Sequence, residues 1–384
     1  MRHLLRLFIL LTFITTACST PASPLATPQP ATVTSTPPTD SQPSNEPSAY
    51  ITFVINVHDW THPSESADTL LRLVDLFEKY GVRGDFYFTA EVSRKYVEER
   101  PDVIERLKNS NMTISYHVRP PHLLYAGFDS RLDEGGNSIA AQQDAALYQT
   151  LLEYETYALD LETGDLDRSR SGGYTYVAQV FGRKPVVAPA PTSSARVKDA
   201  AQRVYASLGA QMTLLYHEAG TDPNQPFEYV DGLLVRPSDF GATRVTSING
   251  SDNFWWNYMG KPGAEQYNPT SMLQSQLVEW ESHNYGRAPF ITAIVHENNF
   301  YRGGAEGWTA IYGSAVGYHY YAMENGKKTD PLPPPYDLSA PDLSRPRSAE
   351  EQAAVWAVYE ELVAYAASNL RVVTSEDIVV MAKR

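Results

Sequence analysis

From residue 50 onward, short apolar runs alternate with longer stretches in which apolar residues recur at helical spacing. The run Tyr50–Val57 is rich in β-branched and aromatic residues, which is typical of a buried strand. Leu70, Leu73 and Phe77 then share one face of a predicted helix, which Gly81 ends. The folded part of the chain therefore begins with a strand followed by a helix.

Strands and helices continue to alternate along the chain. Strand, helix, strand, helix and strand follow one another between residues 50 and 116, which predicts parallel strands with right-handed crossovers. No Gly-x-Gly-x-x-Gly follows the first strand, so a dinucleotide-binding fold has little support. The predicted strands are Tyr50–Val57, Asp85–Thr89, Met112–Tyr116, Pro185–Ala188, Gln211–Tyr216, Leu233–Val235, Phe290–Val295 and Arg371–Thr374.

One long segment interrupts this alternation. Residues Asp129 to Gly173 lack a clear strand pattern, and we expect a helical or irregular insertion around residues 129–184. The pattern resumes after it and ends with a helix from about Ala349 to Ala367 and a last short strand. Residues 50–384 therefore suit one large α/β domain with an insertion.

The start of the chain has the pattern of an export signal. Arg2 opens a basic start, and the apolar run Leu4–Phe13 is too short to span a bilayer. Ala17-Cys18 resembles a bacterial lipoprotein cleavage site, which predicts a signal peptide at residues 1–17 and a lipid on the Cys18 thiol. Cys18 is the only cysteine, so an internal disulfide is ruled out as its use. An ordinary secretory signal with a chance cysteine is the alternative.

A tether is predicted between this signal and the domain. Residues 18–49 begin with the lipidated cysteine and are rich in Pro, Ser and Thr without apolar periodicity. Such a segment buries too little apolar surface to offset the entropy of ordering, so we expect a disordered linker. The prediction is an exported domain held to the bacterial cell envelope, with the membrane as its partner through the lipid.

Charge and composition narrow the choice of partners. The formal net charge is −14, which disfavours nucleic acid, because phosphate binding needs a basic surface. Aromatic residues make up 11% of the chain and include 25 tyrosines, which suits a surface that stacks on neutral sugars.

Histidines stand at the ends of four predicted strands. His58-Asp59 follow the first, His117 the third, His217-Glu218 the fifth and His296-Glu297 a late one. In a parallel barrel the C-terminal strand ends meet at one face, where catalytic residues collect. Neutral imidazoles and a carboxylate are ligands for a divalent metal such as zinc, which acidifies bound water and polarises a carbonyl.

These residues carry a family resemblance. The chain resembles the polysaccharide deacetylases of carbohydrate esterase family 4, as a divergent member, over about residues 50–122 and 288–384. The matching segments are Thr52–Asp59, Gly84–Thr89, Ile114–His117 with His122, Ile294–His296 and Val372–Ile378. The resemblance implies a distorted (β/α)7-type barrel that hydrolyses N- or O-acetyl groups on sugars.

The resemblance also implies roles for single residues. Asp59 takes the metal position of the first family motif, whereas His58 replaces the usual general base and is either a base or a further ligand. His117 and His122 match the two metal-binding histidines, although they are five residues apart instead of four. His296 matches the histidine that protonates the leaving group. The implied cofactor is a divalent metal, with zinc the first choice.

The substrate side of the predicted site is less regular. The third family motif is reduced to Ala188-Pro189-Ala190-Pro191, so the arginine that orients the base in the family is missing and Arg119 is a candidate replacement. Trp255 and Trp256 are candidates for an aromatic platform under a sugar ring, with core packing as the alternative.

Three functions remain after these observations. The leading one is a metal-dependent hydrolase that removes acyl groups from an extracellular glycan. The second is a surface lipoprotein that binds carbohydrate on an inactive deacetylase-like scaffold, which the altered base and third motif would explain. The third keeps catalysis but changes the substrate, either to non-sugar C–N bonds or to another glycan cleavage on a similar barrel.

Overall fold

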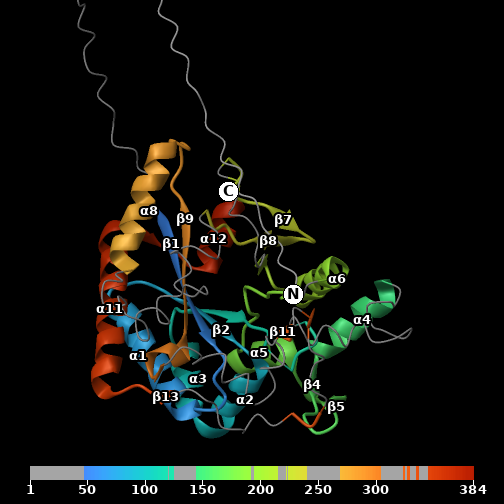
Figure 1. Cartoon of the computed structure of the whole chain (residues 1–384). Helices are drawn as coiled ribbons and strands as arrows, with labels where there is room; N and C mark the ends of the chain where they lie inside the picture. The colour runs from blue at the N-terminus through green and yellow to red at the C-terminus, as the bar shows by residue number, and fades with distance from the viewer. Residues whose placement is uncertain are drawn as a thin grey trace, which may run out of the picture. The chain divides into compact units, whose positions relative to one another are not determined.

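The computed structural model describes residues 47–119, 121–124, 144–191, 194–214, 222, 224–239, 269–303, 323–324, 327–328, 334–336 and 345–384. The chain divides into two units, residues 1–45 and 46–384, and all described residues belong to the second. The predicted signal peptide and Cys18 therefore lie outside the described residues. In the second unit, helices surround a parallel sheet (Figure 1).

The described helices and strands follow the predicted alternation over most of the domain. The helices are α1 (Pro63–Lys79), α2 (Ala90–Glu99), α3 (Pro101–Lys108), α4 (Asp144–Tyr154), α5 (Gly173–Phe181), α6 (Ala195–Leu208), α8 (Pro269–His283), α11 (Ala349–Asn369) and α12 (Ser375–Ala382), with the 3-10 turn η5 (Glu297–Phe300). The strands are β1 (Tyr50–Val57), β2 (Asp85–Phe88), β3 (Thr113–Tyr116), β4 (Tyr157–Leu159), β5 (Leu166–Ser171), β6 (Met212–Thr213), β7 (Tyr229–Val230), β8 (Leu233–Val235), β9 (Phe290–His296), β10 (Arg302–Gly303), β11 (Met323–Glu324), β12 (Lys327–Lys328), β13 (Arg345–Pro346) and β14 (Arg371–Val372).

Strand β1 is the centre of the main sheet. It pairs in parallel with β9 along Tyr50–Asn56 and with β2 along Val54–Val57. β14 pairs with the start of β1, and β3 continues the sheet beyond β2. Every residue of β1 after Tyr50 is buried, because helices or other strands cover both faces. This burial explains why the segment has a continuous apolar run instead of an alternating pattern.

Further backbone hydrogen bonds carry the sheet round into a ring. Residues 186–187 bond to β3, and Val187 also pairs in parallel with β6. β6 pairs in parallel with β8, and the amide of Asp239 beyond β8 donates to the carbonyl of Phe290 in β9 at 3.0 Å. The α/β class with a parallel central sheet is thus confirmed. The order β1, β2, β3, 186–187, β6, β8, β9 is that of a distorted parallel barrel.

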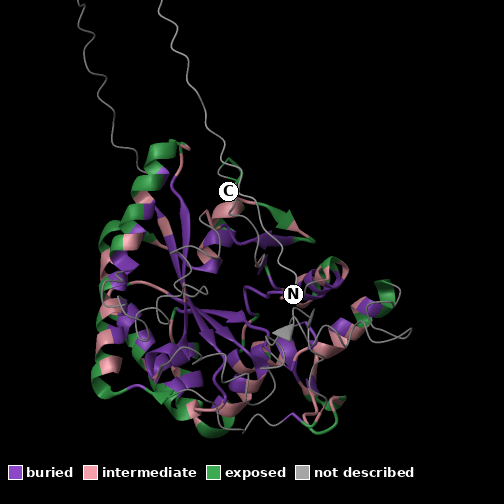
Figure 2. Cartoon of the chain, in the orientation of Figure 1, coloured by how far each residue is buried: buried purple, intermediate pink, exposed green. Residues whose placement is uncertain are grey.

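Two apolar clusters fill the domain. The larger one lies between the strands and helices such as α1, α6 and α11, and includes Phe53, Phe77 and Tyr359. The smaller one fills the inside of the strand ring and consists of Val54, Tyr87, Val186, Val187, Met212, Leu234, Phe290, Val373, Ile378 and Val379. Figure 2 shows β1, β2 and β9 as almost entirely buried, whereas the outward sides of α8 and α11 are exposed.

The insertion, expected to be helical or irregular, contains helices and also two strands that were not predicted. Residues 144–154 form α4, and β4 pairs with β5 as an antiparallel hairpin with a register shift. β5 has the sequence Leu-Asp-Arg-Ser-Arg-Ser and is mostly exposed, so no apolar alternation marks it as a strand. Tertiary pairing with β4 stabilises a segment whose own pattern is polar. Helix α12 was also not predicted.

A buried ion pair spans the inside of the ring. Arg236 follows β8, and its Nη2 donates to Oδ2 of Asp85 at the start of β2 at 2.8 Å, with the two side chains 4% and 0% exposed. Ser375, at the start of α12, donates its amide to the same carboxylate at 3.0 Å and its hydroxyl contacts both partners. The guanidinium also lies over the ring of Tyr87, 5.4 Å from its centroid. The pair thus links β8, β2 and α12.

None of the helices in the described part of the chain is both long and apolar enough to cross a membrane.

Removal of one partner of the buried pair should cost more stability than loss of a surface pair. We expect Arg236→Met to lower the free energy of unfolding by about 3–5 kcal/mol, because Asp85 would remain buried without its counter-charge. Lys95→Ala, which breaks the exposed Lys95–Glu99 pair, should cost at most about 1 kcal/mol. Urea unfolding followed by circular dichroism measures both, and equal losses would contradict the prediction.

Candidate active site

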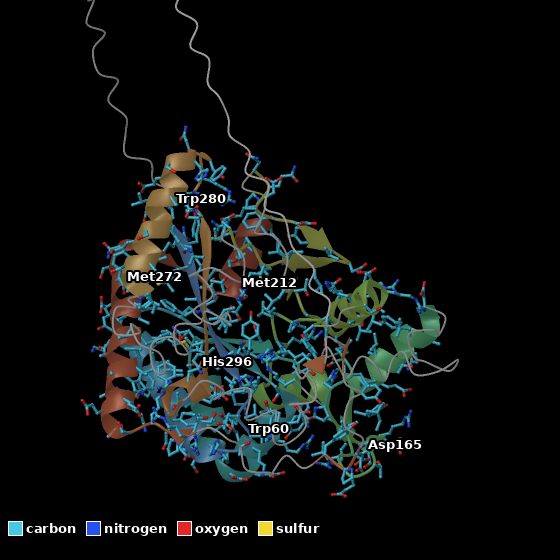
Figure 3. All side chains as sticks on the ribbon, in the orientation of Figure 1. Trp60, Asp165, Met212, Met272, Trp280 and His296 are labelled. Carbon is cyan, nitrogen blue, oxygen red and sulfur yellow. The ribbon has the colours of Figure 1, made fainter. Side chains whose placement is uncertain are left out.

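Three histidines from three different strands meet at one end of the ring. His58 follows β1, His117 follows β3 and His296 ends β9. The rings of His58 and His296 stack with centroids 4.5 Å apart, and those of His58 and His117 lie 5.7 Å apart. All three are at most 2% exposed. The structure therefore brings together the strand-end histidines that the sequence singled out in this part of the chain (His296 is labelled in Figure 3).

Arg119 binds two of these imidazoles. Its Nε donates to Nδ1 of His58 at 2.9 Å, and its Nη2 lies 3.2 Å from Nε2 of His296. A guanidinium only donates, so both imidazole nitrogens accept. Neutral His58 therefore carries its proton on Nε2, and neutral His296 carries its proton on Nδ1. The arginine, which the sequence offered as a substrate-binding residue, fixes the tautomers of both rings.

The site favours neutral imidazoles. The pKa values of His58, His117 and His296 all lie well below the usual value, first because burial penalises the charged form and also because Arg119 brings a positive charge. The three rings are therefore uncharged at neutral pH, and Arg119 carries the positive charge of the cluster.

His117 differs from its two neighbours in its hydrogen bonds. Both of its ring nitrogens are buried without a hydrogen-bond partner among the described residues. Its ring contacts are with His58 and, edge to face, with Tyr87 at 6.4 Å. A buried imidazole of this kind has a lone pair that is available to a proton, a metal or a substrate.

Glu297 anchors the loop that carries His58. Its Oε1 accepts the backbone amides of His58 and Asp59 at 2.6 and 2.5 Å, and its Oε2 lies 3.8 Å from Nε2 of His58. Burial and the nearby charge of Asp59 raise the pKa of Glu297 to about 8. The carboxyl thus holds its proton at neutral pH and binds both amides as a neutral acid. No role was predicted for Glu297, although its place directly after a strand-end histidine was a usable signal.

Asp59, the predicted metal ligand, is held by its own loop. Its Oδ1 accepts the amides of Thr61 and His62 at 3.0 and 3.1 Å. Its Oδ2 accepts the Tyr301 hydroxyl at 2.6 Å and Nδ1 of His62 at 3.1 Å. Four hydrogen bonds use the four lone-pair positions of a carboxylate. In this arrangement Asp59 orders the turn before α1 and ties it to Tyr301, whose contribution no sequence pattern indicated.

His122, the other predicted ligand beside His117, is also engaged. Its Nδ1 accepts the amide of Leu124 at 3.2 Å, and its Nε2 lies 3.2 Å from Oε1 of Glu155. Glu155 is fully buried and also binds the Tyr205 hydroxyl at 2.5 Å and the Tyr174 amide at 2.9 Å. Glu155 belongs to the insertion that was expected to be helical or irregular, and no sequence pattern there indicated it as a partner of His122.

The residues present therefore do not fit the predicted three-ligand metal site. Asp59 and His122 have their lone pairs in other hydrogen bonds, and His117 alone has both nitrogens without one. Within the described residues no group of three or more His, Cys, Asp or Glu side chains is arranged to hold a metal ion. Cys18, His217, Trp255 and Trp256 lie outside the described residues.

Metal analysis tests this reading of the donors. We expect the metal content after incubation with Zn²⁺ and dialysis to be the same in the wild-type chain and in Asp59→Asn, because Asp59 is committed to its turn. His283→Ala, at the exposed end of α8, controls for adventitious histidine binding. One zinc per chain in the wild type, lost in Asp59→Asn, would instead show that the predicted ligands rearrange around an ion.

The chain was compared with known protein families, curated sequences and solved structures. No protein-family model matches the chain, and no curated protein matches it in sequence. Among solved structures, it is similar to a protein from Mycobacterium smegmatis assigned as a polysaccharide deacetylase, with 12% identity, a TM-score of 0.46, and coverage of 89% of this chain and 92% of that one. It is also similar to PuuE allantoinase, with 11% identity, a TM-score of 0.46, and coverage of 88% of this chain and 91% of that one. A third similar structure is a probable polysaccharide deacetylase from Pseudomonas aeruginosa PAO1, with 12% identity, a TM-score of 0.42, and coverage of 87% of this chain and 90% of that one. Likenesses at this distance say nothing about activity.

Proposed function

We propose that this chain is a hydrolase that removes acyl groups from an extracellular glycan. The observation that carries the proposal is the cluster of three neutral imidazoles around one buried guanidinium, at the end of the ring where strands β1, β3 and β9 stop. Such a cluster combines a proton acceptor with a fixed positive charge, the two requirements for attack of water on a carbonyl. The glycan substrate and the acyl group follow from the family resemblance of the motifs around His58, His117 and His296.

His117 is the general base in this proposal. Its ring nitrogens have no hydrogen-bond partner in the described part of the chain, and its lowered pKa keeps it neutral. It takes one proton from water as the water oxygen bonds to the acyl carbon, and the carbonyl electrons move to the oxygen. When the tetrahedral intermediate collapses, the bond to the leaving nitrogen or oxygen breaks and that atom receives the proton from His117. Water is consumed, and a carboxylic acid and a free amine or hydroxyl are formed.

Arg119 stabilises the negative charge that develops on the carbonyl oxygen. A guanidinium in a buried, water-poor site stabilises an oxyanion far more than it would in water. His58 and His296 accept two of its N–H groups and so hold it in place. They act as positioning residues here, which differs from the base and acid roles that the family resemblance implied for them.

A second candidate function is a carbohydrate-binding protein without catalysis. One specific observation favours it: Asp59 and His122, at the positions of the family's metal ligands, make hydrogen bonds that serve the local fold. Activity separates the two candidates, since a binding protein would retain its affinity for glycans and release no acyl group.

Arg119 provides the sharpest test of the hydrolase. We expect the wild-type chain to release acetate from chitin oligomers, acetylated xylan or peptidoglycan. Arg119→Met should then lower kcat by about 10²- to 10³-fold with a smaller change in KM, because the charge acts mainly in the transition state. His283→Ala is the matched control and should keep wild-type rates. Absence of acetate release from all three substrates, or an unchanged kcat in Arg119→Met, would refute the proposal.

The proposal includes export and lipid attachment through Cys18. It rests on the sequence of the first 18 residues and on the Pro-, Ser- and Thr-rich segment that follows. In a bacterial host, the chain should incorporate labelled palmitate and sediment with membranes, whereas Cys18→Ser should do neither. Equal labelling of both forms would remove the lipid anchor from the proposal and leave the hydrolase unaffected.

A further inference from the structure

A large pocket lies beside the candidate active site, between α2 and the β4–β5 hairpin. Its volume is about 1040 Å³. Trp60, which lines the pocket, and Asp165, which lies in the turn between β4 and β5, are both labelled in Figure 3. The walls come from the exposed face of α2, from β4 and its turn, and from Tyr336. The pocket depends on the insertion that the sequence pattern did not resolve.

The packing of the hairpin side shows that this pocket is built into the fold. A Cβ at Gly172 would lie 2.2 Å from the carbonyl oxygen of Tyr157, so glycine is required where the start of α5 approaches β4. The amide of Tyr336 donates to the carbonyl of Leu161 at 2.7 Å, and Nη2 of Arg94 donates to the carbonyl of Ser171 at 2.9 Å. These contacts tie the hairpin to a distant segment and to α2.

The pocket lining includes residues from the loops that carry the active-site histidines. Trp60 stands two residues after His58, and Ala90 begins the helix after β2. His122, on the loop after His117, also lines the pocket. A chain-like substrate with one unit at the imidazole cluster would therefore have room for its neighbouring units here.

The lining suits a neutral, hydroxyl-rich ligand. It combines tyrosine rings with charged groups of both signs: Tyr154, Tyr157, Tyr336, Glu91, Glu98, Glu99, Asp160, Glu162, Arg94, Lys95 and Arg170. Lys95 is already paired with Glu99 at 3.1 Å, so carboxylates outnumber the remaining cations and would repel a polyanion. Carboxylates accept hydrogen bonds from sugar hydroxyls, and guanidinium groups donate hydrogen bonds to them. Half-buried rings such as Tyr157 offer apolar faces to sugar C–H groups.

The size of the pocket indicates several sugar units. Pockets for single small ligands measure about 300–1,000 Å³. At about 1040 Å³ this pocket is just above that range, so it has room for a ligand larger than one hexose ring.

We infer that this pocket binds a neutral oligosaccharide, namely the units that flank the acylated sugar. The inference rests on the proposed function for the identity of the reacting unit, but the binding itself can be measured without catalysis.

Titration calorimetry with chitotetraose and xylotetraose tests the pocket on the full-length chain. We expect one of the two to bind, and Tyr157→Ala to weaken its affinity by at least about threefold through loss of the ring face. Tyr229→Ala is the matched control, because Tyr229 is half exposed on β7, outside the pocket lining, and should keep wild-type affinity. Thermal melts of both variants exclude unfolding as the cause.

The outcomes separate this inference from the proposed function. Binding that weakens in Tyr157→Ala without any acetate release would support the pocket and refute the hydrolase. Acetate release with the same KM in Tyr157→Ala and the wild type would refute the pocket and support the hydrolase. Failure of both oligosaccharides to bind, or tighter binding of polygalacturonate than of either, would overturn the assignment of a neutral oligosaccharide.

Discussion

The candidate site depends on the burial of one permanently charged side chain. Arg119 is 7% exposed, and a guanidinium that leaves water must find acceptors. His58 and His296 supply them, one from the end of β1 and one from the end of β9. This requirement fixes the tautomers of both rings and leaves His117 as the imidazole whose nitrogens lack hydrogen bonds in the described chain. Burial of the rings, and after it the charge of Arg119, lowers the pKa values of His58 and His296. The charge of Arg119 thus determines which two imidazoles are held by hydrogen bonds and which one is not.

The carboxyl groups around this charge serve the backbone. Glu297 binds two consecutive amides of the loop after β1, and Asp59 binds two more further along the same loop. Together they hold this loop against the end of β9 and against Tyr301. A hydrogen-bonded loop of this kind positions His58 without help from an ion. The resemblance of the motifs implied a metal ligand at Asp59, whereas in the structure this carboxylate accepts four hydrogen bonds.

The insertion forms a pocket close to the loops that carry the imidazole cluster. Glu155 reaches His122 from the end of α4, and the β4–β5 hairpin that follows encloses a pocket against α2. One loop, which carries His117 and His122, therefore faces the imidazole cluster at one end and the pocket at the other. In the proposed function, reaction and recognition of the glycan chain are neighbouring tasks of the same barrel mouth.

The sequence by itself determined the parallel α/β core and the placement of His58, His117 and His296, because buried parallel strands are continuous apolar runs and their C-terminal ends share one face. It did not predict the β4–β5 hairpin, since β5 is polar and is stabilised by pairing with β4. The sequence also did not predict the hydrogen-bond partners of Asp59 and His122. Hydrogen bonds from distant segments determine which side-chain lone pairs remain available for a ligand. The local sequence pattern does not predict such contacts. Only the tertiary structure could show that a motif typical of metal ligands here holds a loop in place.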